Sequence, residues 1–173
     1  MLLVLLTSCA STPEIDYQDK TMHTRVNIWY NDLRPGEIPS ANYHRGKILP
    51  VGTPVRVLKI DKKTIRFQAK GSGDQYVLRY SEPDVYGPIN EYFYRMFHEV
   101  KPKIEGRFTK EECRAIWLGE LEVGMTKEAA LIAWGYPPAH KTMSLKDDTW
   151  TYWVDRTTTR TVTFVGGKIK TIE

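Results

Sequence analysis

The side chains in this 173-residue chain that could do chemistry are two cysteines, four histidines and one adjacent pair of aspartates. Cys113 stands near Ile116 and Trp117, in a segment that shows no base to activate its thiol. Asp147 and Asp148 are neighbours in a turn, so their carboxylates point apart and make a poor acid/base pair. The histidines are scattered, without the spacing of metal ligands: His23, His44, His98 and His140. We therefore expect no catalytic residue, no metal site and no cofactor.

The other cysteine, Cys9, follows an apolar run in the order Leu6-Thr7-Ser8-Cys9, which fits a bacterial lipobox. In such a segment an apolar stretch enters the membrane, small residues fit the peptidase, and the cysteine thiol takes the diacylglycerol. The alternative is an apolar end with a chance cysteine. We expect residues 1–8 to be a residual signal peptide, Cys9 to be lipidated, and residues 9–24 to form a polar tether. Several acyl chains on Cys9 would anchor the protein stably to a membrane.

Composition excludes some classes of protein. Hydrophobic residues make up 41% of the chain, and five tryptophans are present, which is enough for one or two small domains. The net charge is +4, and no run of lysine and arginine of the nucleic-acid-binding type occurs. Six basic residues and one acid do lie between Arg56 and Lys70. They predict either the solvated side of a hairpin, which we favour, or a cationic face toward anionic lipid headgroups.

Residues 25–82 carry β signals. Short alternating segments are separated by turns rich in glycine and proline, and the clearest cover residues 55–60, 64–69 and 75–80. This spacing is typical of a small barrel. The segment Leu49-Pro50-Val51-Gly52-Thr53-Pro54-Val55-Arg56-Val57, with the two hairpin strands after it, is similar to bacterial SH3-like domains. That resemblance implies a module that binds peptides or cell-wall components.

Residues 83–106 change to a helical period. Apolar side chains recur at i, i+3, i+4, i+7, i+8 and i+11, which predicts an amphipathic helix: Ile89, Tyr92, Phe93, Met96, Phe97 and Val100. An aromatic stripe of this kind could grip a membrane or a partner, but packing onto its own domain is the more common role. We expect this helix to bridge the barrel and the C-terminal unit.

Residues 107–173 predict two short helices followed by strands. Thr109 and Glu112 match a capping box, which opens a helix that ends at Gly119. Thr126 is placed to cap a second helix, and Gly135 is suited to a left-handed C-terminal conformation. Strands are expected over residues 150–154, 160–165 and 168–172, with Gly166-Gly167 as a two-residue hairpin turn. Residues 143–145 are a further candidate strand.

The motifs of this segment together resemble the BamE (SmpA/OmlA) family of small lipoproteins. They are Gly124-Met125-Thr126-Lys127-Glu128, Gly135-Tyr136-Pro137, Trp150, and Val162-Thr163-Phe164-Val165-Gly166-Gly167-Lys168-Ile169. The resemblance implies an ααβββ unit and a role in outer-membrane protein assembly through protein contacts. The expected fold class is therefore α+β: a small SH3-like barrel, a bridging helix and a BamE-like unit.

Three aromatic residues of the first C-terminal strand are the candidates for partner binding. Alternation places Trp150 and Tyr152 on the face toward the helices and Trp153 on the outer face. Trp153 could anchor a partner or pack under the long helix or the barrel, and neither is favoured. We expect a lipid-anchored envelope protein, in the outer membrane and facing the periplasm, that assembles or scaffolds envelope proteins without catalysis. The alternative is a peptidoglycan- or ligand-binding module built on the SH3-like half. Neither nucleic acid nor a small-molecule substrate is expected.

Overall fold

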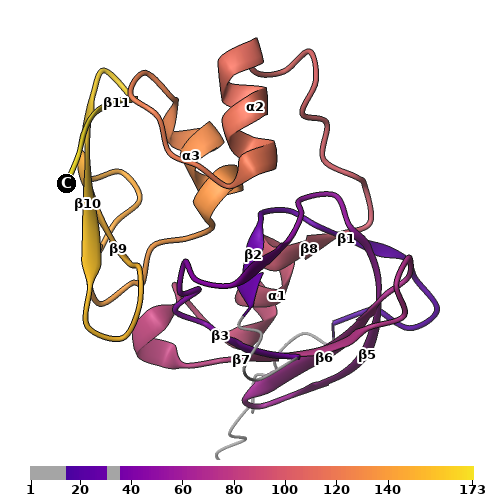
Figure 1. Cartoon of the computed structure of the whole chain (residues 1–173). Helices are drawn as coiled ribbons and strands as arrows, with labels where there is room; N and C mark the ends of the chain where they lie inside the picture. The colour runs from indigo at the N-terminus through magenta and orange to yellow at the C-terminus, as the bar shows by residue number, and fades with distance from the viewer. Residues whose placement is uncertain (1–14, 31–35) are drawn as a thin grey trace, which may run out of the picture.

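The computed structural model describes residues 15–30 and 36–173 and has the mixed α+β architecture expected from the sequence (Figure 1). Two apolar cores are formed. The first lies under the β-rich N-terminal part, and the second lies between two helices and a three-stranded sheet. The predicted signal peptide, Cys9 and the first residues of the predicted tether lie outside the described residues.

The first core is enclosed by a curled six-stranded sheet of order β3-β7-β6-β5-β1-β8. β3 runs parallel to β7, and the other neighbours are antiparallel. A separate two-stranded sheet pairs β2 (Ile28–Tyr30) with β4 (Lys47–Leu49). The three clearest predicted strands are confirmed as β5, β6 and β7. The bounds of the large sheet are β1 (Met22–Thr24), β3 (Glu37–Pro39), β5 (Pro54–Asp61), β6 (Thr64–Ala69), β7 (Gln75–Arg79) and β8 (Phe97–His98).

The predicted tether extends too far along the chain. Ile15 and Tyr17 pack against the first core, and β1 pairs on one side with β5 and on the other with β8. Met22 and Thr24 are buried. A three-residue strand is too short to show a period in the sequence, so its role depends on partners that lie far away in the chain.

The predicted bridging helix is shorter than expected. After a 3₁₀ turn at Glu82–Asp84, α1 covers Ile89–Met96, and its aromatic residues lie in the first core, as favoured from the sequence. Phe97 leaves the helix and enters β8, which pairs with β1. Val100, the last residue of the predicted stripe, is 69% exposed. The apolar periodicity continued past Met96 because a buried strand residue fell by chance on the helical period.

Helices α2 (Lys110–Leu118) and α3 (Lys127–Trp134) begin where their caps predict. Thr109 and Glu112 form the capping box, and the Thr126 hydroxyl accepts a hydrogen bond from the N–H of Ala129. Glu112 also accepts one from the N–H of Thr126 at 2.8 Å, so one buried carboxylate joins the N-termini of both helices. Gly135 has a positive φ of 74° but ψ of −170°, so the left-handed helical conformation expected for it is wrong.

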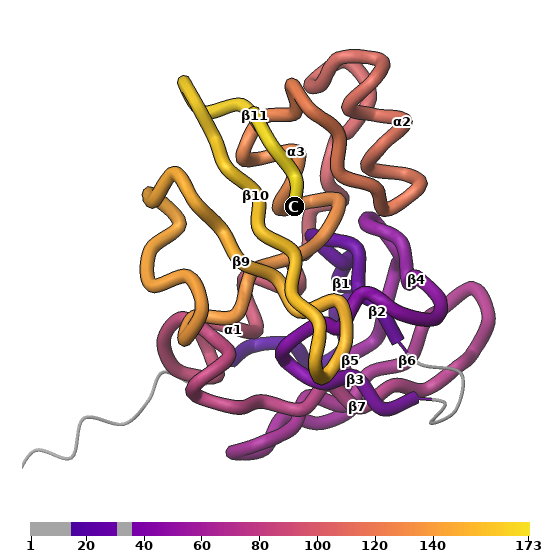
Figure 2. The backbone as a smooth tube through the Cα atoms, turned by 60° about the vertical axis from the view of Figure 1, so that its left-hand side comes forward, coloured from indigo at the N-terminus to yellow at the C-terminus, as the bar shows by residue number. Residues whose placement is uncertain are grey.

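The C-terminal sheet has the order β11-β10-β9 and is antiparallel. Its strands are β9 (Thr149–Trp153), β10 (Thr159–Val165) and β11 (Lys168–Ile172), as expected to within one residue at each end. Residues 143–145 form no strand, because they lie in bends and a turn that lead into β9. Figure 2 shows how the loop between β9 and β10 reaches to the neighbourhood of β3 in the N-terminal half.

Candidate functional site

The two halves are joined by buried polar side chains of the N-terminal half that bind the C-terminal ends of α2 and α3. The amide of Asn27 donates to the carbonyl oxygens of Ile116, at 2.6 Å, and of Ala133, at 3.1 Å. Its oxygen accepts the N–H of Val51 at 2.8 Å. The last carbonyls of a helix have no partner within the helix. Asn27 donates a hydrogen bond to one such carbonyl near the end of each helix, and these two bonds fix both helices against the barrel.

Asn42 and His44 extend this junction around Trp134, the last residue of α3. Asn42 donates to the carbonyl oxygen of Trp134 at 2.8 Å and accepts the N–H of Trp29 at 2.9 Å. The ring nitrogens of His44 lie 2.8 Å from the carbonyl oxygens of Trp134 and Trp153. Burial lowers the pKa of His44 to about 4, against the opposing effect of these two carbonyls, so the ring is neutral at pH 7.

An aromatic column crosses the junction. The rings of His44 and Trp134 are stacked with centroids 3.9 Å apart. Trp29 approaches His44 edge-on at 5.6 Å, and Tyr152 lies perpendicular to Trp134 at 5.4 Å. Arg160 covers the Trp134 ring, with its guanidinium carbon 5.4 Å from the ring centroid. Offset and edge-to-face pairs of this kind stabilise a packed interface beyond the area that they bury.

Two of the predicted partner-binding residues belong to the interior. Trp150 and Tyr152 are both 0% exposed. Trp150 packs against Phe164 of the neighbouring strand, and the Tyr152 hydroxyl donates to the carbonyl oxygen of Gly135 at 3.3 Å. Both lie on the helix-facing side of β9, where solvent is excluded, so neither can contact a partner in this structure. Only Trp153 remains a candidate.

Trp153 is half-buried. Lys141 places its Nζ atom 4.6 Å from the centroid of the indole ring, and the ring of His140 lies 6.3 Å away. Neighbouring side chains thus cover part of the ring, while its carbonyl oxygen contacts His44 at the junction. The Trp153 ring is therefore partly packed and partly accessible, which matches neither a fully exposed partner anchor nor a fully packed side chain.

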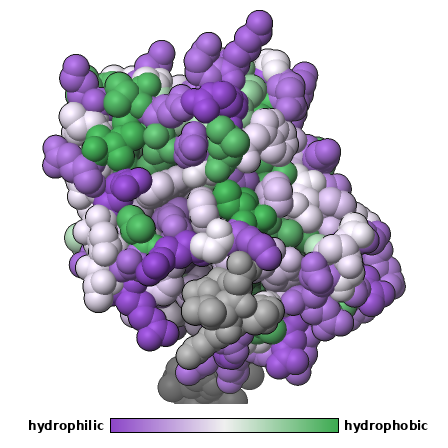
Figure 3. Space-filling view, viewed as in Figure 1, coloured by the Kyte–Doolittle hydropathy of each residue, from purple (hydrophilic) through white to green (hydrophobic). Residues whose placement is uncertain are grey.

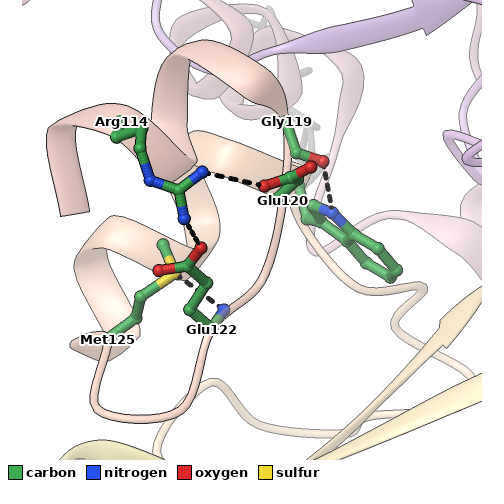
Figure 4. Close-up of polar contacts among 6 residues, drawn as sticks. Arg114, Gly119, Glu120, Glu122 and Met125 are labelled. Atoms are coloured by element: carbon green, nitrogen blue, oxygen red, sulfur yellow. Dashed lines mark hydrogen bonds and ion pairs between the residues drawn. The ribbon is translucent and has the colours of Figure 1, made fainter. Parts of the chain in front are cut away.

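The turn after α2 is braced on the side of the junction (Figure 4). Arg114 lies 3.6 Å from the carboxylate of Glu120 and also contacts Glu122. The indole nitrogen of Trp134 donates to the carbonyl oxygen of Gly119 at 2.8 Å. Gly119 has φ of 68°, and a Cβ there would lie 2.4 Å from Ile48 of β4. Glycine is therefore needed at this position for both its backbone conformation and its close approach to the N-terminal half.

A cleft of about 840 Å³ opens at the junction. Most of its wall comes from the N-terminal half, and the loop after β9 supplies the rest. Its lining residues are Trp29, Tyr30, Glu37, Ile38, Pro39, Tyr43, Arg45, Gly46, Arg79, Asp155, Arg156 and Thr157. Its volume lies within the range of ligand-binding pockets, and its mixture of aromatic and polar side chains is typical of binding sites.

Arginine side chains dominate the charge of this cleft. Arg79 pairs with Glu37 at 2.7 Å, and Arg45 pairs across the two halves with Asp155 at 3.5 Å. Both pairs are largely exposed, so they contribute little to stability. Arg156 is exposed and has no ion-pair partner among the described residues. The described lining residues of the cleft thus present three guanidinium groups against two carboxylates.

The loop that carries Arg156 is held in a defined shape by Asp155. One oxygen of this carboxylate accepts the N–H groups of Thr157, at 2.9 Å, and of Thr158, at 2.8 Å. These bonds lower the pKa of Asp155 to about 2, so the carboxylate is ionised at every physiological pH. Arg156 is therefore presented at the cleft by an ordered turn. The sequence contains the Asp-x-Thr-Thr signal for that turn but gives no sign that it faces the barrel.

The other residues considered for chemistry do not converge. Cys113 has a free thiol packed at the edge of the second core, with its sulfur 3.7 Å from the carbonyl oxygens of Ile104 and Phe108. Within the described ranges, no group of three or more histidine, cysteine or acidic side chains is placed to hold a metal ion. No helix in that part of the chain is both long and apolar enough to cross a bilayer.

Comparisons with family models, with curated proteins and with solved structures gave no match to this chain. The BamE-like and SH3-like resemblances therefore rest on the motifs quoted from the sequence. The residues that form the junction and the cleft were not identified from those motifs. Asn27 and Asn42 carry no local signal of burial, because the helix carbonyls to which their side chains donate are 89 to 106 residues away in the chain.

Proposed function

We propose that this protein is a bacterial cell-envelope lipoprotein that acts as a non-enzymatic assembly or scaffold factor, and that its cleft holds a segment of a partner protein. The observation that carries the proposal is the cleft, to which both halves contribute and in which Arg156 has no ion-pair partner among the residues that the structure describes. Aromatic and arginine side chains are the residue types that contribute most to the energy of protein interfaces. An acidic or carboxylate-bearing segment fits the excess of arginine.

The firm attachment of the two halves to each other also supports the proposal. Buried hydrogen bonds from Asn27 and Asn42 hold the ends of both helices, and the His44–Trp134 stack fills the space between them. A site built from two halves keeps its shape only if the halves do not move against each other. This arrangement suits a protein that works by contact, and it supports an SH3-like half and a BamE-like half that act as one body.

The proposal includes the anchor predicted from the sequence. Lipidation at Cys9 would hold the protein at a membrane, which we take to be the outer membrane on its periplasmic side. The partners would then be other envelope proteins. Neither an enzymatic activity nor a nucleic-acid partner forms part of the proposal.

The experiment is affinity capture from detergent-solubilised envelopes with the wild-type protein and two variants. Arg156→Glu reverses a charge at the cleft, and Trp153→Ala removes the partly accessible indole of β9, which is not among the lining residues of the cleft. We expect both variants to fold and Arg156→Glu to capture at least tenfold less of the partner. Lys170→Glu, an exposed lysine of β11, is the matched control. Equal capture by wild type and Arg156→Glu would remove the cleft from the proposal.

A second candidate function is binding of peptidoglycan or of another ligand by the N-terminal half. It is favoured by one observation, that most of the wall of the cleft belongs to that half. Co-sedimentation of the whole protein with purified peptidoglycan distinguishes the two. Saturable sedimentation that Arg156→Glu abolishes would favour wall binding over a protein partner.

A further inference from the structure

A β-bulge turns one lysine of the N-terminal sheet toward solvent. Regular alternation along β5 would place Lys59 on the same side as Val57, which is buried. The register of β5 with β6 shifts between these two residues, so that Val57 pairs with Phe67 but Lys59 pairs with Arg66. Lys59 and Arg66 are both exposed. The bulge therefore sets two cations directly opposite each other on the outer face of the sheet.

Like charges at directly opposed positions of two antiparallel strands destabilise the sheet. Asp61 offsets part of this repulsion: hydrogen bonds in the turn, first from the Thr64 hydroxyl, lower the pKa of its carboxyl group, and the charge of Lys59 adds to that effect. Asp61, the acid of this hairpin, uses its carboxylate to accept the N–H groups of Lys63 and Thr64 and the Thr64 hydroxyl in the turn. Neither Lys59 nor Arg66 forms an ion pair among the described residues, so part of their repulsion persists in the folded protein, which is expected where a surface is kept for binding rather than for stability.

Four further cations surround this pair. We use the name basic face for the whole set: Arg56, Lys59, Lys62, Lys63, Arg66 and Lys70. No member forms an ion pair among the described residues. Arginines elsewhere in the described chain are commonly paired with acids, as Arg79, Arg95 and Arg107 are. Figure 3 shows hydrophilic residues over the part of the molecule where β5 and β6 lie.

The N-terminal segment of the described chain joins the barrel beside this face. β1 pairs with β5 through Met22 and Val55, and the Lys70 ammonium donates to the Thr21 hydroxyl at 2.7 Å. Residues 21–24 therefore lie beside the basic face. A membrane surface that contains anionic headgroups is an extended partner whose charge complements the exposed cations on the outer face of this curled sheet.

We propose that the basic face docks on a membrane surface that contains anionic lipid headgroups. Each lysine or arginine near such a surface strengthens binding by roughly fivefold. Three cations together therefore strengthen it on the order of a hundredfold, and the effect falls with salt because exposed charges are screened. This inference goes beyond the proposed function, since it depends neither on the cleft nor on acylation of Cys9.

The test uses the full chain with Cys9→Ala, so that no acyl chain contributes. Its sedimentation is measured with vesicles of phosphatidylcholine alone and with vesicles that contain about one-third phosphatidylglycerol. We expect binding only to the anionic vesicles, and a loss of binding as the salt concentration rises. Absence of binding to the anionic vesicles at low salt would overturn the proposal.

Two triple variants of equal charge locate the surface. Arg56→Gln, Lys59→Gln and Arg66→Gln together remove three cations of the basic face, and binding should weaken at least tenfold. Lys103→Gln, Lys110→Gln and Lys170→Gln remove three exposed lysines elsewhere, and binding should change less than about threefold. Equal weakening by both sets would mean that net charge alone drives binding. Binding of duplex DNA as tight as that of the vesicles would assign the face to another polyanion.

The single variant Lys59→Gln tests the proposal even if the triple variant does not fold. Because it removes the opposed like charge, it should unfold at a slightly higher urea concentration than the parent while binding anionic vesicles several-fold more weakly. A variant that is both less stable and weaker in binding would indicate a merely structural role for Lys59.

Discussion

The side chain of Asn27 donates a hydrogen bond to the carbonyl oxygen of Ile116 across 89 residues of chain, at 2.6 Å. This contact joins a residue that follows the first strand to the C-terminal end of α2, and the same amide reaches Ala133 in α3. The two halves of the protein are therefore connected through backbone carbonyls in the last turns of both helices. The candidate site depends on this connection, because the cleft is lined from both sides.

Replacing Asn27 by alanine should lower the free energy of unfolding by about 2–4 kcal/mol, since it removes the side-chain partner of the Ala133 carbonyl and of the Val51 N–H and leaves the Ile116 carbonyl only the N–H of Gly119. Urea denaturation followed by tryptophan fluorescence measures this. Gln75→Ala, at an exposed position in β7, should change the value by less than about 0.5 kcal/mol. A similarly small change for Asn27→Ala would show that the junction does not hold the halves together.

Glu112 links the N-termini of α2 and α3, and its substitution should weaken both. Burial opposes ionisation of this carboxylate, but hydrogen bonds from the N–H groups of Thr126 and Thr109 outweigh it and lower the pKa below its usual range. A lowered folded-state pKa stabilises the protein above the unfolded value of 4.5, and that stabilisation is lost as the pH falls through the folded value.

In Glu112→Gln, an amide N–H₂ would face one of these N–H donors, so we expect a loss of about 1–2 kcal/mol at pH 7. The difference from wild type should shrink between pH 5 and pH 3. Glu111→Gln, an exposed position in the same first turn, is the control. A difference that stays constant across this pH range would contradict the linkage.

His44 should make the stability of the protein depend on pH over a higher pH range than Glu112 does. Its pKa is lowered from 6.5 to about 4, so the unfolded chain binds a proton between these values and the folded one does not. Stability is therefore full above pH 6.5 and falls, by up to about 3 kcal/mol, as the pH drops toward 4. His44→Phe should remove this slope, whereas the exposed His98→Phe should retain it. Identical slopes for both variants would place the titration elsewhere.

The anchor can be tested separately from the fold. If Cys9 is acylated, Cys9→Ala should move the protein from the membrane fraction to the soluble fraction of lysed cells, with its urea midpoint unchanged. Washing at high salt is part of the measurement, because the basic face could retain some protein electrostatically. Membrane association of Cys9→Ala that survives high salt would refute lipidation as the anchor.

The parts of the fold that the sequence predicted are those with local causes. Thr109 and Thr126 cap helices with atoms three residues away, and Gly166-Gly167 turns a hairpin between adjacent strands. The missed features have distant causes. β1 and β8 are defined by pairing with each other, and the outward position of Lys59 depends on a bulge that strand alternation does not reveal.

The candidate site was missed for the same reason. Residue type and strand alternation predict Trp150, Tyr152 and Trp153 as partner-binding residues, yet Trp150 and Tyr152 fill the second core. Arg156 and Trp29 reach one cleft only because the β9–β10 loop crosses to the barrel, where Arg45 pairs with Asp155. No periodic pattern in either segment predicts that Arg156 and Trp29 line the same cleft.

The central claim, that the cleft between the halves holds a partner protein in the envelope, is tested most directly by photocrosslinking in intact cells. A photoreactive residue at Tyr43, in the cleft, should give a discrete adduct with an envelope protein, and Arg156→Glu should abolish it. The same residue at Thr171, on β11 and outside the cleft, should not give that adduct. Identical adducts from both positions, or none from Tyr43, would contradict the claim.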